Sequence, residues 1–181
     1  MDTHEADPLA GSLTHTDSLV LAVRPLAALP TGQQLADANR SAAILLALLI
    51  SFDEPVPPLD ESPELVAHLQ RLDQKLDLLM ELVGQWLHRE LALPPAQLLR
   101  LGARGVAWRP AQALPAGPAS VRLYLQPGLP KPLELPAALR PLEDGSMLAE
   151  FVGLEAPVTD GLERYIFRCH RRAVAQARRP A

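Results

Sequence analysis

The chain has 181 residues and a net charge of −4. This length suits one compact domain with an additional element, and the negative charge argues against a nucleic-acid footprint over the whole chain. Leucine and alanine dominate a hydrophobic fraction of 48%, whereas aromatic residues make up 4%. The composition therefore favours aliphatic cores and coiled-coil seams over aromatic ligand platforms.

Cysteine usage and apolar run length indicate the compartment. Cys169 is the only cysteine, so an intrachain disulfide is excluded and a reducing compartment is expected. No cationic start precedes an apolar run of the signal-peptide type. The longest apolar run, 42–50, falls well short of the roughly 20 residues needed to cross a bilayer. We expect a soluble cytoplasmic protein with no membrane insertion.

The amino-terminal third is expected to hold a strand and a helix. Residues 1–17 are polar and are predicted to be flexible. The range 18–52 is predicted to form a strand and then an amphipathic helix that packs on the rest of the fold, because apolar residues recur at helical spacing after a Thr31–Gln34 capping box. Residues 53–62, with their prolines and acids, are predicted to be a stiff linker.

A heptad pattern dominates residues 63–92 and predicts one long helix. Ser62 and Pro63 mark its start, and apolar residues then alternate at spacings of four and three. The seam consists of Leu65, Leu69, Leu72, Leu76, Leu79, Val83 and Trp86. Such a helix would be roughly 40 Å long, more than a small domain can cover. We therefore expect an oligomer seam, with the core of one domain as the alternative.

The two halves of the heptad helix differ in width. Polar residues flank the seam as far as Leu76, whereas Met80, Leu82 and Leu87 widen the apolar arc beyond it. A wide arc is typical of a higher-order bundle or of docking on the chain's own domain. We expect a homotetramer, with a dimer as the next choice.

After Pro94 and Pro95 the apolar period changes from helical to alternating. Short strands are expected around 106–108, 121–126, 133–137 and 147–153, with the third at an edge or interrupted because of Pro132 and Pro136. Residues 95–156 are therefore predicted to be a small barrel. A last helix, 158–179, should start at a capping box formed by Asp160 and Glu163.

The last helix carries an arginine face that is either solvated or a surface for an acidic partner or a phosphate. Its members are Arg164, Arg168, Arg171, Arg172, Arg178 and Arg179. Cys169 is expected to be a core residue on the opposite stripe. The five histidines lack metal-ligand spacing, and no nucleophile or phosphate-loop motif is found, so we expect neither a metal site nor an enzyme.

The segment Leu99-Arg-Leu-Gly-Ala-Arg-Gly-Val-Ala-Trp108 resembles the first-strand region of the PilZ domain. The downstream strands and last helix follow the same order, so the resemblance covers about residues 95–175. With the preceding strand and helices, the chain is similar to atypical PilZ proteins that carry a helical insertion. The resemblance implies an α+β fold, a small antiparallel barrel flanked by helices, with the insertion assembling homo-oligomers.

PilZ domains generally bind cyclic di-GMP through an Arg-x-x-x-Arg motif and an acid/Asn-x-Ser-x-x-Gly motif. The second motif aligns with Arg100, Gly102, Arg104 and Gly105, of which Gly105 alone matches in kind. A cation stands in place of the acid, and the serine hydroxyl is gone. The segment before the barrel carries a single arginine, Arg89, so the first motif is also missing. We expect the standard nucleotide site to be absent and no cofactor to be bound.

Together, these features predict a regulatory protein rather than an enzyme. The chain is expected to be a non-enzymatic regulatory adaptor that self-assembles and acts on an unidentified protein partner, without binding nucleic acid. The resemblance implies a setting in bacterial cyclic di-GMP signalling, type IV pilus motility or virulence. The alternative is a receptor for cyclic di-GMP or another nucleotide at a non-standard arginine site, and a weaker third reading is a purely structural scaffold.

Overall fold

The structure is a computed structural model that describes residues 9, 11–51, 63–90, 93–126, 129 and 131–177. At positions 63, 87, 88, 176 and 177 the backbone alone is described. The predicted linker, 53–62, lies outside the described residues, as do Arg178 and Arg179.

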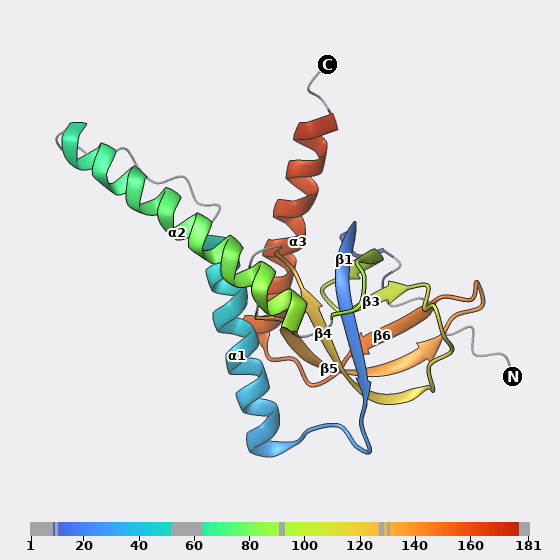
Figure 1. Cartoon of the computed structure of the whole chain (residues 1–181). Coiled ribbons are helices and arrows are strands. Elements are labelled where there is room, and N and C mark those ends of the chain that lie inside the picture. The colour runs from blue at the N-terminus through green and yellow to red at the C-terminus, as the bar shows by residue number, and fades with distance from the viewer. Residues whose placement is uncertain are drawn as a thin grey trace, which may run out of the picture.

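Six strands and three helices make up the described chain. Their order is β1 (Thr14–Pro25), α1 (Gly32–Ser51), α2 (Pro63–Glu90), β2 (Gln97–Gly102), β3 (Gly105–Trp108), β4 (Gly117–Tyr124), β5 (Leu133–Pro141), β6 (Met147–Phe151) and α3 (Ala156–Ala177). The strands close into an antiparallel barrel in the order β1-β2-β3-β6-β5-β4 (Figure 1). The expected α+β fold with a small barrel and flanking helices is confirmed.

The long strand β1 closes the barrel. Its first half, from Thr14 to Leu19, pairs with β2, and its second half, from Val20 to Pro25, pairs with β4. Two boundaries from the sequence are therefore wrong. The barrel is not confined to 95–156, and residues 14–17 are strand rather than flexible terminus. The physical reason is that β2 and β4 would otherwise be open edges with unpaired backbone groups.

The barrel interior is aliphatic, as the composition predicts. On β4, Val121 and Leu123 are fully buried while Arg122 and Tyr124 face outward, the alternation typical of a strand with one buried face. Trp108 and Phe151 are the aromatic side chains in the core cluster. The inward stripe of α3, which includes Val158, joins the same cluster and covers the barrel.

Strand β5 is not an edge strand, although its prolines predict one. It pairs with β4 along residues 133–139 and with β6 along 137–141. Pro136 lies just before the β6 ladder begins, and its carbonyl accepts the Val152 N–H at 3.0 Å. The missing amide proton of Pro136 therefore falls where no ladder partner requires it.

Buried Asn39 joins α1 to the start of α3. Its Nδ2 donates to the carbonyl oxygens of Leu35 and Gly153 at 3.1 and 3.0 Å. Its Oδ1 accepts the Glu155 N–H at 2.9 Å, which satisfies an orphan amide just ahead of α3. The helix therefore begins at Ala156, two residues before the predicted 158. The capping box predicted at Asp160 and Glu163 is wrong, because both residues lie inside the helix and a distant side chain acts at its start.

The helices α1 and α3 pack side by side and run in the same direction. Leu46 of α1 lies against Gly161 of α3, where an added Cβ would come within 3.1 Å of it. Further along, the Arg168 guanidinium donates to the Ile50 carbonyl near the end of α1. Helix α2, in contrast, projects away from the barrel (Figure 1). With 28 residues it is about 42 Å long.

Candidate functional site

The seam of α2 is uncovered along its whole length. All seven predicted seam residues are exposed, with exposed fractions from 37% at Val83 to 62% at Trp86. Among the α2 side chains that the structure describes, every one is exposed or half-exposed. The helix is therefore amphipathic without a described apolar surface to lie on, which is the geometry of an assembly element.

The wide half of α2 does not dock on its own barrel. Leu79, Met80 and Leu82 are each exposed, and the side chain of Leu87 is outside the described set. The alternative of docking on the chain's own domain is therefore wrong for the described residues. Leu78, which the heptad count places outside the seam, is 56% exposed and lies one turn before Leu82. It widens the apolar arc further.

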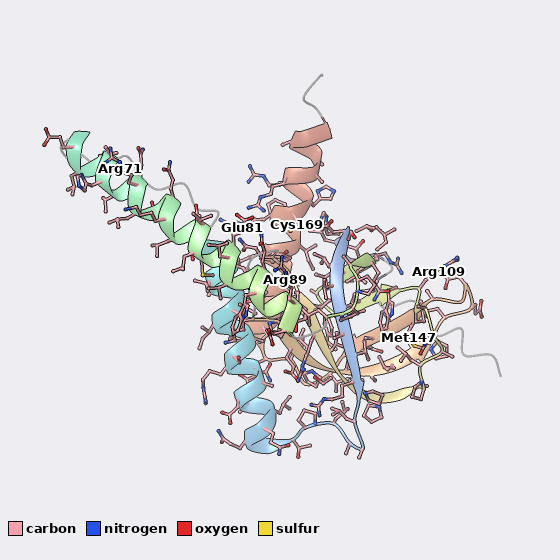
Figure 2. The ribbon with its side chains drawn as sticks, viewed as in Figure 1. Arg71, Glu81, Arg89, Arg109, Met147 and Cys169 are labelled. Atoms are coloured by element: carbon pink, nitrogen blue, oxygen red, sulfur yellow. The ribbon has the colours of Figure 1, made fainter. Side chains whose placement is uncertain are left out.

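Polar residues occupy the opposite side of α2. Figure 2 shows Arg71, Glu81 and Arg89 along this helix. Glu81 and Gln85 are one turn apart, and the Gln85 amide donates to the Glu81 carboxylate at 3.2 Å. Such pairs give an exposed helix face a few tenths of a kcal/mol each. This side is polar and solvent-exposed, so the seam is the face suited to a partner helix.

The residues that align with the nucleotide motif lie on the β2–β3 hairpin. Arg100 is half-exposed on β2, opposite Thr16 and Ala107 on the neighbouring strands. Arg104 is exposed at the turn, and its carbonyl accepts the Phe151 N–H at 2.8 Å. At Gly105 an added Cβ would lie 2.6 Å from the Ala149 carbonyl oxygen. The one matching residue of the motif is thus explained by the close approach of β6.

Gly102, where the motif has serine, lies under a leucine from the start of the chain. An added Cβ would come 2.7 Å from Leu9 Cδ2. Leu9 is 2% exposed and clusters with Ala107, Leu148 and Leu142 on the outside of the barrel. We call this site the Leu9 seat, formed by Gly102, Ala107, Leu142 and Leu148.

A tight turn holds Leu9 in place. Its carbonyl accepts the Ser12 N–H at 3.4 Å and the Ser12 Oγ–H at 3.1 Å. Gly11 has φ +79°, a conformation that favours glycine. This contact cannot be predicted from the sequence, because an isolated leucine in a polar stretch shows no helical or strand periodicity. Leu9 therefore covers the Gly102 position of the motif, whereas Arg100 and Arg104 stay at least partly exposed.

The arginine face of α3 divides into different roles. Arg164 and Arg171 are exposed, and the Arg171 guanidinium lies 5.9 Å from the centre of the half-exposed Phe167 ring. Arg168 instead binds the Ile50 carbonyl at the carboxyl end of α1, where a cation is favourable. Arg172 lines a cleft of about 550 Å³ beside Cys169. The four arginines therefore have different neighbours, and their role as a shared face for a partner or a phosphate stays a prediction.

Cys169 is half-buried rather than full core, and Figure 2 shows it on α3. Burial raises the pKa of its thiol. Burial also raises the pKa of Tyr165, whose hydroxyl donates to the Leu125 carbonyl at 3.0 Å. Both groups are protonated near neutral pH, so this cleft supplies no thiolate nucleophile.

Two other kinds of site are not found in the described part of the chain. No group of three or more His, Cys, Asp or Glu side chains there could hold a metal ion. None of the described helices is long and apolar enough to cross a membrane.

A closed six-stranded antiparallel barrel with a motif-bearing β2–β3 hairpin and flanking helices is the architecture of a PilZ-type regulatory domain. Residues 45–179 match the family described as atypical PilZ domain, cyclic di-GMP receptor. The chain belongs to this family.

A solved structure supports the fold over nearly the whole length. It is a crystal structure of a pathogenic protein from Xanthomonas campestris, described as a tetrameric PilZ domain self-assembled via a helical bundle. The TM-score is 0.69 at 29% sequence identity, and the match covers 92% of this chain and 90% of the other. No curated protein sequence matches the chain.

Proposed function

We propose that this protein is a non-enzymatic PilZ adaptor that assembles into a homotetramer through α2 and acts by protein–protein contacts in the cytoplasm. The proposed setting is bacterial motility, type IV pilus function or virulence signalling. One observation carries the assembly proposal. A 28-residue helix presents seven exposed seam residues and projects from the barrel.

The energetics favour association. Covering the exposed half of a leucine-sized side chain contributes about 1 kcal/mol, so the seven seam positions offer on the order of 7 kcal/mol per chain. An exposed apolar stripe of this length is also unusual for a monomer. Burial of the seam between copies is the simplest way to remove it from water.

A tetramer is favoured over a dimer by the width of the apolar arc. In a two-helix coiled coil the seam is narrow and its flanks are polar. Here Leu78, Met80 and Leu82 flank the seam and are all exposed, so a dimer would leave them in water. The Xanthomonas protein assembles as a tetramer through a helical bundle, which supports the same proposal for this chain.

We further propose that the standard cyclic di-GMP site is not functional here. Arg100 stands where an acid or Asn would hold the base, and the Leu9 seat takes the place of the serine. The second candidate is a cyclic di-GMP receptor with a non-standard arginine site, favoured by the family's description. Calorimetric titration separates the two: micromolar or tighter binding of cyclic di-GMP would support the receptor.

The test of assembly is sedimentation equilibrium on matched variants. Leu72→Asp with Leu79→Asp places two carboxylates in the seam and is expected to give monomers at tens of micromolar. The control, Gln70→Asp with Gln74→Asp, adds the same charge on the opposite side of α2 and should keep the wild-type mass. A wild-type monomer, or equal masses for both double variants, would contradict the proposal.

A further inference from the structure

A cleft of about 480 Å³ lies between the outside of the barrel and α1, away from both the α2 seam and the motif hairpin. Its lining comes from the barrel (Arg24, Ser120, Glu134, Pro136), from the connection after β1 (Leu26, Ala28, Leu29, Pro30) and from α1 (Gln34, Ala38, Ser41). This volume lies within the range of small-molecule sites.

One wall of the cleft contains a carboxylate held in a fixed position. Ser120 Oγ donates to Glu134 Oε1 at 2.6 Å, and Arg122 Nε donates to Glu134 Oε2 at 3.2 Å. Ser120 itself is 6% exposed, so its hydroxyl cannot move freely into water. The carboxylate is therefore oriented by the fold, as a preformed binding group must be.

The guanidinium of Arg24 lies beside this carboxylate without being hydrogen-bonded to it. Arg24 Nη2 is 3.9 Å from Glu134 Oε1, beyond hydrogen-bond distance, and the Arg24 side chain is 63% exposed. Glu134 already has hydrogen bonds from Ser120 and Arg122. The cleft thus presents an anion and a cation side by side, each with capacity for a further partner.

The connection after β1 gives the cleft an apolar part. Leu26 and Leu29 are half-buried there, and Pro30 adds saturated carbon without a donor. Pro136 adds more saturated carbon next to Ser120, its partner on β4, while Gln34 and Ser41 of α1 are polar. None of the lining side chains is aromatic, so the site offers no ring for a base to stack on. A ligand suited to this cleft therefore needs adjacent opposite charges and an aliphatic body.

We propose that this cleft binds a free α-amino acid with an aliphatic side chain. The ligand's ammonium binds Glu134, its carboxylate binds Arg24, and its side chain lies against Leu26 and Leu29. Ammonium and carboxylate are joined through one carbon in an α-amino acid, which matches the adjacent Glu134 and Arg24. An anion bound at Arg24 would be repelled by the adjacent Glu134 carboxylate, and a cation bound at Glu134 would be repelled by the adjacent Arg24 guanidinium. The inference does not rest on the assembly proposal.

Calorimetry on the full-length protein tests the head-group assignment. Leucine is expected to bind, whereas N-acetyl-leucine and leucinamide, which each lack one charge, should bind at least tenfold more weakly. Glycine should also bind about tenfold more weakly, because it has no side chain for the apolar part of the cleft. Equal binding of the blocked derivatives, tighter binding of GMP, or no leucine binding up to about 10 mM would overturn the proposal.

Matched variants locate the site. Arg24→Ala and Glu134→Gln are each expected to weaken leucine binding tenfold or more. Arg40→Ala is the control, because Arg40 pairs with Asp37 on the exposed side of α1 and does not line the cleft. Circular dichroism and sedimentation confirm that each variant folds and assembles as the wild type does. Unchanged affinity in both cleft variants would place the ligand elsewhere and refute the proposal.

Discussion

The Leu9 seat makes a quantitative prediction about the missing serine of the nucleotide motif. Gly102→Ser places a Cβ 2.7 Å from Leu9 Cδ2, which is closer than such contacts are found. Because the clashing atom is the end of a flexible side chain, we expect Leu9 to leave its seat while the backbone of β2 stays in place. The serine and the seated leucine are then mutually exclusive.

The magnitude follows from the burial of Leu9. Removing a fully buried leucine from its site forfeits about 2 kcal/mol, so Gly102→Ser should lower the free energy of unfolding by about that amount. Leu9→Ala should cost about 2 kcal/mol by itself. In the double variant Leu9→Ala removes the clash with the serine. The loss of unfolding free energy in the double variant should therefore equal the loss in Leu9→Ala alone. The coupling energy of the cycle is therefore about 2 kcal/mol.

Urea unfolding at one fixed protein concentration measures the cycle, since the proposed assembly would make the apparent stability depend on concentration. The control cycle pairs Gly102→Ser with Leu98→Ala. Leu98 is 68% exposed on the same strand, so its truncation should add to the cost of the serine without coupling. The reasoning fails if Leu9→Ala and Gly102→Ser add in the same way as the control pair does.

Four other predictions concern separate parts of the molecule. Asn39→Ala removes three hydrogen bonds at the α1–α3 junction and should cost about 2–3 kcal/mol of unfolding free energy in urea, whereas exposed Gln33→Ala should be nearly neutral. Burial raises the pKa of Cys169, so its reaction with a thiol reagent at pH 8 should be slower than in the urea-unfolded chain; an equal rate would contradict this. The side-chain and backbone hydrogen bonds from Ser146 lower the pKa of Asp144. The contribution of ionised Asp144 to stability is therefore present above the ordinary carboxyl pKa and is lost as the pH falls through the lowered pKa. Ser146→Ala should raise the pKa of Asp144 in an NMR titration. In the proposed α2 bundle we expect parallel packing, because it puts the wide apolar halves of the helices together. Leu65→Cys with Cys169→Ser should then form disulfide-linked dimers on mild oxidation, and the absence of cross-linking would favour antiparallel packing.

Local sequence pattern was sufficient to predict the helices and strands in which the apolar repeat continues over many residues or alternates strictly. The spacing of four and three residues predicts α2 to within two residues of its observed end, and alternation on β4 separates buried Val121 and Leu123 from Arg122. These signals are readable because each residue's environment is set by its place on one helix or strand. Spacing alone also names the seven seam residues of α2, which are exposed in the structure, and their role in assembly stays a prediction.

Contacts between segments that are distant in sequence could not be predicted from local sequence patterns. The barrel closure by β1, the cap on α3 from Asn39 and the burial of Leu9 each join residues whose separation in sequence carries no period. The same is true of the Glu134 and Arg24 pair, which becomes a site only when β1, β4 and β5 lie side by side. Sequence reasoning treated these residues as ordinary strand, helix or terminus.

The sequence by itself determined that this protein has an aliphatic barrel, a helix whose apolar stripe exceeds what its own domain can cover, and a nucleotide motif without its acid and serine. The first two follow from composition and periodicity, which act over a few residues, and the third follows from the resemblance of residues 99–108 to the PilZ motif. The tertiary structure alone decided that the stripe is uncovered over both halves of α2 and that Leu9 occupies the face where the serine would stand. Whether an apolar side chain finds a neighbour depends on how the strands close in space, and local sequence does not encode that closure.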